Sequence, residues 1–384
     1  MEEVKKAKLF RIFFWVGFAV AIAATLLEVA RGRNANYIVY SDATKLFWEG
    51  INPYTMDFVE QHGRYFLYLP DFCCIFAPIA FLPWWLGPFV YNLGNYTLFY
   101  FSIKTLPEKF NNVKPWIFIF LLPIVLQSVF WYQYNLVVCY IFLFAFTLLE
   151  KGKGFWAVLL ILISTFTKVY GGIQLGMLFL YPNKWKNFGY AIIIGIILFL
   201  LPMINPNFDN PLATYGYMMD MNSTHQSAVD YIGILYARGL KSFLLPNFRI
   251  VQLTVLGILC CIFFIKYRQW CDITFRTQCL AIMMGYVILF SDSPETHTYI
   301  IALAGYSLVF FTRKNKNKID WILFGLLVIN FDILPTDLLC PPKIHEFIHQ
   351  TFWLDVYTFT ICWFLILRWA IMEDSDNTAK PIVK

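Results

Sequence analysis

The sequence predicts an all-α, polytopic integral membrane protein, and three observations carry this prediction. First, 59% of the 384 residues are hydrophobic and only 14% are charged. A water-soluble domain has about 25% charged residues, so this composition excludes an ordinary soluble enzyme, and its apolar content excludes a disordered chain. Second, the apolar residues form blocks long enough to cross a hydrocarbon layer about 30 Å thick. Third, blocks such as Ala191–Leu201 do not alternate between apolar and polar residues, so they predict helices rather than strands.

Short basic clusters separate the apolar blocks and predict the orientation of the chain. Loops that face the cytoplasm carry an excess of Lys and Arg. The run Ile12–Ala30 is too long for a typical signal peptide and is expected to be a retained first helix with a cytoplasmic N-terminus. The basic clusters are Lys5–Arg11, Lys104–Lys114, Lys151–Lys153, Lys184–Lys186, Lys266–Arg276 and Arg313–Lys318.

This orientation makes the protein multi-pass, with long external loops at about 31–65 and 205–249. We predict one integral domain over residues 1–384, with about 11 to 13 membrane segments of the required length. Both loops are expected to carry surface helices. Ser227–Lys241 has apolar residues at helical spacing, and Asp42–Trp48 could do the same.

Two stretches depart from a simple alternation of crossings. Residues 155–181 lie between two basic clusters, so they must cross and return, and Lys168 stands in the middle, shortly before Gly171 and Gly172. Because glycine weakens helices, two half-length helices are expected to meet at Lys168, near the external face. The stretch 66–104 is divided by Leu82-Pro83-Trp84-Trp85, which leaves open whether both of its pieces cross.

With this topology, the polar groups beside the apolar segments lie on the external side. Ionisable residues at membrane depth are costly and usually mark a pathway or a site. The alternative is that these residues are merely solvated in loops, or that a lysine extends its ammonium group to the interface. The polar groups are Asn36, Tyr40, Asp42, Tyr132–Asn135, Lys168, Asn222–His225 and Asp292–His297.

A lone cation, several carboxylates and a histidine on one side suit a reaction of a phosphorylated lipid. Such a reaction needs a carboxylate that accepts a proton from the attacking hydroxyl group. It also needs a cation that stabilises the departing phosphate. Asp42 or Glu295 could be the base, and Lys168 and His297 could contact the phosphate.

Several short motifs, in the right order along the chain, resemble those of glycosyltransferase family 87. The resemblance implies a membrane-embedded fold of the GT-C type. It also implies transfer of a hexose, typically mannose, from a polyprenyl-phosphate carrier to a lipid or glycan acceptor at the external face. The motifs are Asn36–Tyr40, Gly50–Tyr54, Tyr65–Pro70, Ala77–Pro83, Gln133–Asn135, Ser164–Lys168 and Ser291–Tyr299.

The resemblance also implies where the protein works and which residues bind substrate. It favours the periplasmic face of a bacterial inner membrane, with membrane lipids as surroundings, no nucleic-acid partner and no cofactor besides the lipid-linked donor. The implied substrate-binding residues are Asn36, Tyr40, Asn135, Lys168 and His297.

One position departs from the family pattern. The family has an aspartate, thought to be the catalytic base, where this chain has Asn36. An amide cannot accept the proton of the acceptor hydroxyl group. Either Asp42, six residues further on, or Glu295 takes the role, with Asp42 preferred, or the protein is not a transferase of the standard kind.

Two other interpretations were considered. His345-Glu346 and His349 form an HExxH sequence, which on a helix can bind zinc. An obvious third ligand is missing from the sequence, so we expect no metal site there. A transporter or lipid flippase is the alternative function, although the sequence shows no internal repeat of the kind found in many transporters.

Overall fold

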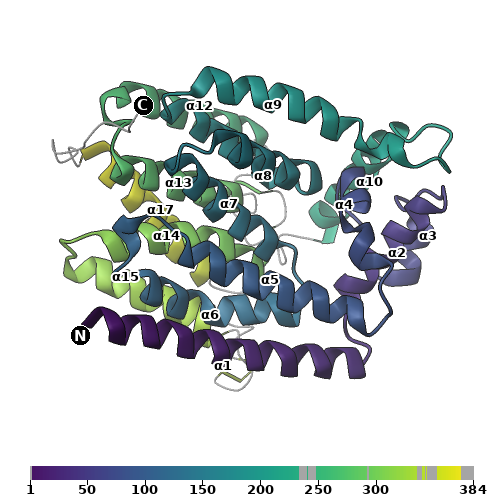
Figure 1. Cartoon of the computed structure of the whole chain (residues 1–384), viewed down its shortest axis with the longest axis horizontal. Coiled ribbons are helices and arrows are strands. Elements are labelled where there is room, and N and C mark those ends of the chain that lie inside the picture. Colours follow the sequence, from purple (N-terminus) through teal and green to yellow (C-terminus); the bar gives the residue numbers. More distant parts are fainter. Residues whose placement is uncertain are drawn as a thin grey trace. The chain divides into compact units, whose positions relative to one another are not determined.

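The computed structural model describes residues 2–232, 240, 248–291, 294–334, 340, 341, 343 and 353–372. All regular elements within these residues are helical, which confirms the predicted all-α class (Figure 1). Three helices are long and apolar enough to cross a membrane, judged by length and composition: Val4–Ala30, Phe248–Ile265 and Leu354–Met372. Further apolar helices of 10–17 residues accompany them. The chain is therefore a polytopic α-helical membrane protein.

The chain forms two compact units, and each is described by itself. The first unit contains Met1–Leu106, Val125–Leu175 and Trp185–Tyr231, and the second contains Pro107–Ile124, Gly176–Lys184 and Ile232–Lys384. The α6 helix (Lys114–Phe130) and the 3-10 helix η2 (Val169–Leu180) contribute residues to both units. The single domain expected from the sequence stays a prediction.

The first unit contains most of the predicted site. Its longest helix is α1, which is followed by the external segment and then by a bundle of shorter helices. These elements are α1 (Glu2–Ala30), α2 (Ala35–Trp48), α3 (Met56–His62), α4 (Pro70–Ala80), α5 (Leu86–Lys104), α7 (Asn135–Glu150), α8 (Gly154–Thr167), α9 (Lys184–Phe199), η3 (Leu201–Ile204) and α10 (Ala213–Ile232).

The basic clusters of this unit lie at one end of its bundle. The α1 helix runs antiparallel to α5, because the Phe10 ring lies 4.6 Å from Tyr100 while the Asn92 amide donates to Thr25 at 2.9 Å. The start of α1 therefore lies beside the end of α5. The α7 helix runs parallel to α5, so the turn that follows α7 also belongs to this end. The clusters Lys5–Arg11 and Lys151–Lys153 consequently share one end of the unit.

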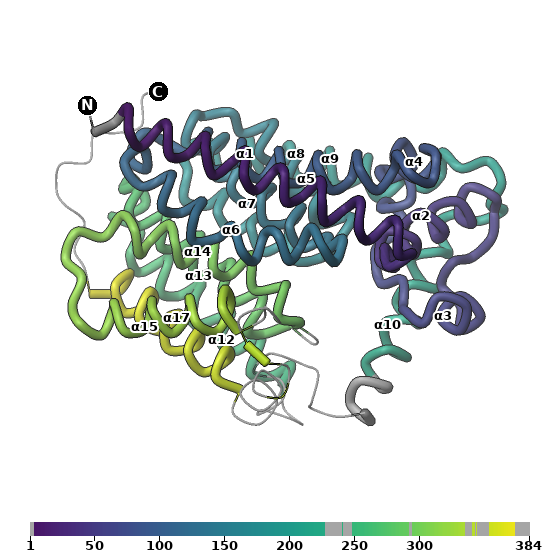
Figure 2. Tube along the Cα trace, turned by 90° about the horizontal axis from the view of Figure 1, so that it is seen from below, coloured from purple at the N-terminus to yellow at the C-terminus, as the bar shows by residue number. Residues whose placement is uncertain are grey.

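The opposite end is built from segments that the sequence assigns to external loops, together with α4 of the stretch 66–104. The helices α2, α3, α4 and α10 gather where α1 ends (Figures 1 and 2). Tyr37 and Ser41 of α2 donate hydrogen bonds to the last carbonyl groups of α4, at Ile79 (3.2 Å) and Ala80 (3.3 Å). Burial raises the pKa of Tyr37 to about 12, so its hydroxyl group stays neutral and keeps its donor.

The two pieces of residues 66–104 differ in length in the structure. The α4 helix has 11 residues, which at 1.5 Å per residue is about 16 Å and too short to cross the hydrocarbon layer. The α5 helix has 19 residues and reaches about 28 Å, enough for one crossing. Only α5 is long enough to span.

The predicted interruption at Lys168 is confirmed, with one difference. The α8 helix ends at Thr167, and Lys168 adopts an extended conformation with φ −142° and ψ 116°. The segment that follows, η2, is a 3-10 helix of 12 residues rather than a second α-helix. Long 3-10 helices are uncommon, and within a longer helical segment they often mark a functional hinge.

The predicted surface helices are partly within the described residues. The predicted helix Asp42–Trp48 is the second half of α2. The predicted helix Ser227–Lys241 overlaps the end of α10, and most of its remainder lies outside the described residues.

The second unit packs its helices around large buried side chains. Trp363 is 1% exposed and donates from Nε1 to the carbonyl of Ile282 at 2.9 Å. Gly285 lies against this ring, and a Cβ there would overlap the indole. The helices and helical turns of this unit are η1 (Glu108–Phe110), α12 (Phe248–Ile265), η4 (Tyr267–Gln269), α13 (Ile273–Leu289), η5 (Thr296–Thr298), α14 (Tyr299–Thr312), α15 (Lys318–Val328), the π-helix η6 (Ile329–Ile333) and α17 (Leu354–Met372).

Candidate functional site

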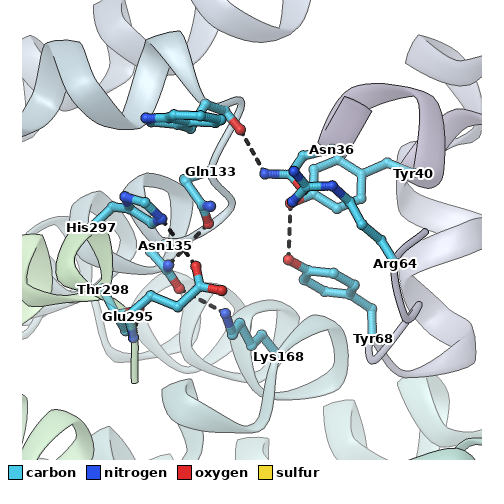
Figure 3. A network of polar contacts seen from close by, with 11 residues as sticks. Asn36, Tyr40, Arg64, Tyr68, Gln133, Asn135, Lys168, Glu295, His297 and Thr298 are labelled. Carbon is cyan, nitrogen blue, oxygen red and sulfur yellow. Dashed lines mark hydrogen bonds and ion pairs between the residues drawn. The ribbon is translucent and has the colours of Figure 1, made fainter. Parts of the chain in front are cut away.

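The candidate site of the first unit lies at the end opposite its basic clusters. Four segments that are distant in sequence supply its polar groups: the first turns of α2, the segment between α3 and α4, the loop 131–135 and the junction of α8 with η2 (Figure 3). Hydrogen bonds connect these segments, so the arrangement is fixed by long-range contacts rather than by local sequence.

The loop 131–135 has a constrained backbone. Tyr132 has φ +52°, a left-handed conformation that non-glycine residues rarely adopt. Its side chain is 1% exposed and its ring stacks at 6.4 Å on Tyr91. The backbone amide of Gln133 donates to the carbonyl of Ser128 at 2.8 Å. This packing holds the carbonyl of Trp131 and the side chain of Asn135 in place at the two ends of the loop.

Lys168 and Asn135, both predicted to bind substrate, are in direct contact. The Lys168 Nζ donates to Asn135 Oδ1 at 2.7 Å, and Asn135 Nδ2 donates to Gln133 Oε1 at 3.2 Å (Figure 3). The same ammonium group lies 4.8 Å from the ring centroid of Tyr170 and 5.7 Å from that of Tyr68. The printed contacts of this half-buried ammonium group are therefore a neutral amide and two aromatic faces, which hold the cation in place.

Gly171 allows the chain to turn back directly after Lys168. Its backbone amide donates to the carbonyl of Lys168 at 3.2 Å. A Cβ at this position would lie 2.5 Å from Ser164 Oγ and 2.9 Å from the Ser164 carbonyl carbon. Contacts this short force backbone movement, so the close return of η2 onto α8 requires glycine.

Gly171→Ala is therefore expected to destabilise the first unit by about 1–3 kcal/mol, the usual cost of overpacking, and to lower transfer by displacing Lys168. The measurements are thermal unfolding in detergent and sugar transfer. Gly195→Ala in α9 is the matched control, because a Cβ there meets nothing within 4 Å. Equal unfolding temperatures of the two variants would contradict the assigned role of Gly171.

Asn36 is connected to a residue that the sequence analysis missed. Asn36 Nδ2 donates to the carbonyl of Trp131 at 2.7 Å, and Arg64 Nη1 donates to Asn36 Oδ1 at 2.9 Å (Figure 3). In the sequence, the charge of Arg64 does not distinguish it from the other basic residues of the loop 31–65.

Tyr40 lies on the same face of α2 as Asn36 and forms part of a tyrosine pair. Its hydroxyl group is 3.0 Å from that of Tyr68, another residue that the sequence analysis did not single out. The Tyr68 ring packs edge-on against Tyr134 at 5.3 Å. Tyr40 is buried and Tyr68 is partly exposed, so Tyr68 is the member of the pair that a substrate can reach.

Asp42 is placed on a different face of α2. At 3.6 residues per turn, six residues separate its side chain from that of Asn36 by about 120° around the helix axis. Asp42 Oδ2 lies 3.1 Å from His62 Nε2 of α3, and Oδ1 lies 3.8 Å from Lys45 Nζ. The His62 Nδ1 is 2.9 Å from the carbonyl of Phe58. The two ring nitrogens of His62 therefore contact the Asp42 carboxylate and the Phe58 carbonyl group.

Glu295 and His297 belong to the second unit, where they contact each other. His297 Nε2 lies 3.0 Å from Glu295 Oε2, with 60% of the Glu295 side chain and 22% of the His297 side chain exposed. The Glu295 side chain also accepts from the backbone amide of Thr298, whose hydroxyl group accepts in return from the Glu295 amide. This capping box fixes the carboxylate at the start of η5, next to the imidazole of His297.

Within the described residues, no group of three or more His, Cys, Asp and Glu side chains could hold a metal ion. The HExxH sequence at His345–His349 lies outside the described residues.

Comparison with known protein families matches residues 66–291 to glycosyltransferase family 87. This match covers more than half of the chain. The chain belongs to glycosyltransferase family 87. It is therefore a membrane glycosyltransferase, which moves a sugar from a donor to an acceptor. No curated protein and no solved structure gives a significant match.

The match of family 87 includes part of the candidate site. Asn135, Lys168 and Tyr68 lie within the matched residues, as expected from the motifs that resemble the family. The α2 helix, with Asn36 and Asp42, lies before the matched residues. Glu295 and His297 lie after them, so the assignment of this chain to family 87 rests on its central part.

Proposed function

We propose that this family 87 glycosyltransferase transfers a hexose, preferentially mannose, from a polyprenyl-phosphate carrier to a lipid or glycan acceptor. The reaction would take place at the periplasmic face of a bacterial inner membrane, with the N-terminus in the cytoplasm. The proposal rests on the half-buried ammonium group of Lys168. Its Nζ donates to Asn135 Oδ1 at 2.7 Å and lies between the rings of Tyr68 and Tyr170. A fixed cation in such surroundings suits the phosphate of a lipid-linked sugar.

In the proposed reaction, a hydroxyl oxygen of the acceptor attacks the anomeric carbon of the donor sugar. The bond between this carbon and the phosphate oxygen breaks, and the departing polyprenyl phosphate keeps the electron pair. The transition state carries positive charge on the sugar, as in other glycosyl transfers. The hydroxyl proton passes to Asp42 or Glu295, while Lys168 and His297 stabilise the departing phosphate. Asn36 and Tyr40 contact the substrate, and no cofactor takes part.

The proposed orientation is supported by the two ends of the first unit. The clusters Lys5–Arg11 and Lys151–Lys153 lie at one end of the unit. The α8 helix starts directly after Lys153 and ends directly before Lys168, so Lys168 lies at the other end. Because basic clusters stay on the cytoplasmic side, Lys168 would face the periplasm. Lipid-linked sugars are donors suited to that face, where soluble nucleotide sugars are not supplied.

The test is transfer of labelled mannose in vesicles that contain the purified protein. We expect label to move from polyprenyl-phosphate mannose to a lipid acceptor, and none to move from a nucleotide-linked mannose. Vesicles without protein are the control. Transfer from the nucleotide sugar alone would overturn the proposed donor, and transfer of another hexose but not mannose would overturn the proposed sugar.

A further inference from the structure

We propose that Arg64 is a second phosphate-binding residue of the donor site, and that the neutral side chain of Asn36 keeps its charge available. This inference rests on the proposed function, since it concerns the phosphate of the same lipid-linked donor. It gives a positive role to the amide at position 36, where a carboxylate would have been expected to serve as the base.

The backbone directs Arg64 toward Asn36. The α3 helix begins with a cap, in which the amide of Phe58 donates to Thr55 Oγ1 at 3.2 Å, and it ends at Gly63 in the left-handed conformation with φ +63°. Arg64 follows directly, and its Nη1 reaches Asn36 Oδ1 at 2.9 Å. A glycine in this conformation ends α3 and turns the chain, which brings a residue from the end of one helix to the start of another.

Asn36, the hydrogen-bond partner of Arg64, does not neutralise the positive charge of the guanidinium group. Guanidinium is always positively charged, and the side chain of asparagine is neutral. Within the described residues, Arg64 forms no ion pair with a carboxylate. Arg313, by contrast, is paired with Asp320 at 2.7 Å. Of its five N–H donors, Arg64 uses one on Asn36 in the described structure, which leaves the guanidinium able to bind an anion.

Arg64 and Lys168 are both connected to the loop 131–135. Asn36, which binds Arg64, donates to the carbonyl of Trp131, and Lys168 donates to Asn135. Four residues span at most about 14 Å, so the two cations flank a short piece of fixed backbone. The Lys168 ammonium group lies 5.7 Å from the ring centroid of Tyr68, whose hydroxyl group contacts that of Tyr40 (Figure 3). Tyr40 shares a face of α2 with Asn36, the partner of Arg64. A sugar phosphate bound beside Tyr68 would contact Lys168, and the proposal extends this contact to Arg64.

Two cations match the charge that develops during the reaction. A sugar linked through a phosphodiester carries one negative charge, while the departing lipid phosphate, a monoester, carries up to two. A second cation therefore gains interaction energy as the bond breaks, and an interaction that strengthens in the transition state raises the rate. Arg64 is thus expected to bind the departing lipid phosphate more strongly than the intact donor.

The experiment measures binding of polyprenyl phosphate to the full-length protein in detergent micelles, together with sugar transfer. We expect Arg64→Gln to weaken binding about tenfold to a hundredfold, the worth of one charged hydrogen-bonding group. Asn36→Asp is expected to weaken binding in the same direction, because the new carboxylate pairs with Arg64. In the Arg64→Gln background, Asn36→Asp should have much less effect, since the partner is gone.

The control variant is Arg31→Gln, an exposed arginine just after α1 in the same external segment. Unchanged binding by Arg64→Gln, when the wild type binds polyprenyl phosphate, would overturn the role of Arg64 alone. Faster transfer by Asn36→Asp would also overturn it, because position 36 would then need a base rather than a neutral partner. If the wild type binds no polyprenyl phosphate, the proposed function fails as well.

Discussion

Replacing Lys168 with alanine is expected to lower sugar transfer about 10²-fold or more, the scale for losing one fixed charge-stabilising group. Lys168 Nζ is held by Asn135 Oδ1 and lies over the Tyr170 ring, and Lys168 is the one basic residue of the described residues 164–172. The effect should be mainly on kcat, because the phosphate gains negative charge as it departs. The measurement is transfer of label from polyprenyl-phosphate mannose in vesicles.

Lys186→Ala is the matched control for this variant. Lys186 also lies over an aromatic ring, 5.8 Å from the centroid of Tyr190, but at the start of α9, beside the start of α8. It should therefore insert normally and transfer at nearly the wild-type rate. A Lys168→Ala protein that inserts normally and keeps full activity would remove Lys168 from the site.

The second large effect is expected from Asp42→Asn, which should lower transfer about 10²- to 10⁴-fold if Asp42 is the general base. Asp42 is the first candidate because it belongs to α2, in the same unit as Lys168. Its side chain is 37% exposed and is fixed by His62 at 3.1 Å. The amide keeps the size of the carboxylate and removes its ability to accept a proton.

Glu295→Gln is the parallel variant, because Glu295 is the other carboxylate that could be the base. Glu49→Gln is the control, since Glu49 is an exposed carboxylate directly after α2. We expect Asp42→Asn to be inactive and the other two variants to transfer. Loss of transfer in Glu295→Gln instead would assign the base to the Glu295–His297 pair, and full activity of both variants would exclude both residues.

Much of the site was predictable from local sequence. A lysine shortly before two glycines, within an apolar stretch, predicted a break in the helix. In the structure, α8 ends at Thr167 and Lys168 has an extended backbone conformation. The polar run at Tyr132–Asn135 predicted an external connection between two helices, and the structure has a loop there, between α6 and α7. These features are local, because helix length and helix-breaking residues act within a few positions of the chain.

The less local features were not predictable. From the sequence, Asp42 is preferred as the replacement for the missing carboxylate at Asn36, and this role stays a prediction. In the structure, the rotation of α2 turns Asp42 toward His62 of α3, while Asn36 faces Arg64 and Trp131. Helical periodicity gives the angle between two side chains around the helix axis. Which side of the helix faces the site depends on the segments that pack against the helix.

The sequence by itself determined the class of this protein: an all-α membrane protein. Backbone polar groups find no partners in lipid except one another, so long apolar segments that cross a membrane form helices. Only the tertiary structure decided which polar groups meet. The bond from Asn36 to Trp131 joins residues 95 positions apart, and that from Lys168 to Asn135 joins residues 33 apart. Such contacts depend on how helices pack, which no local pattern of residues specifies.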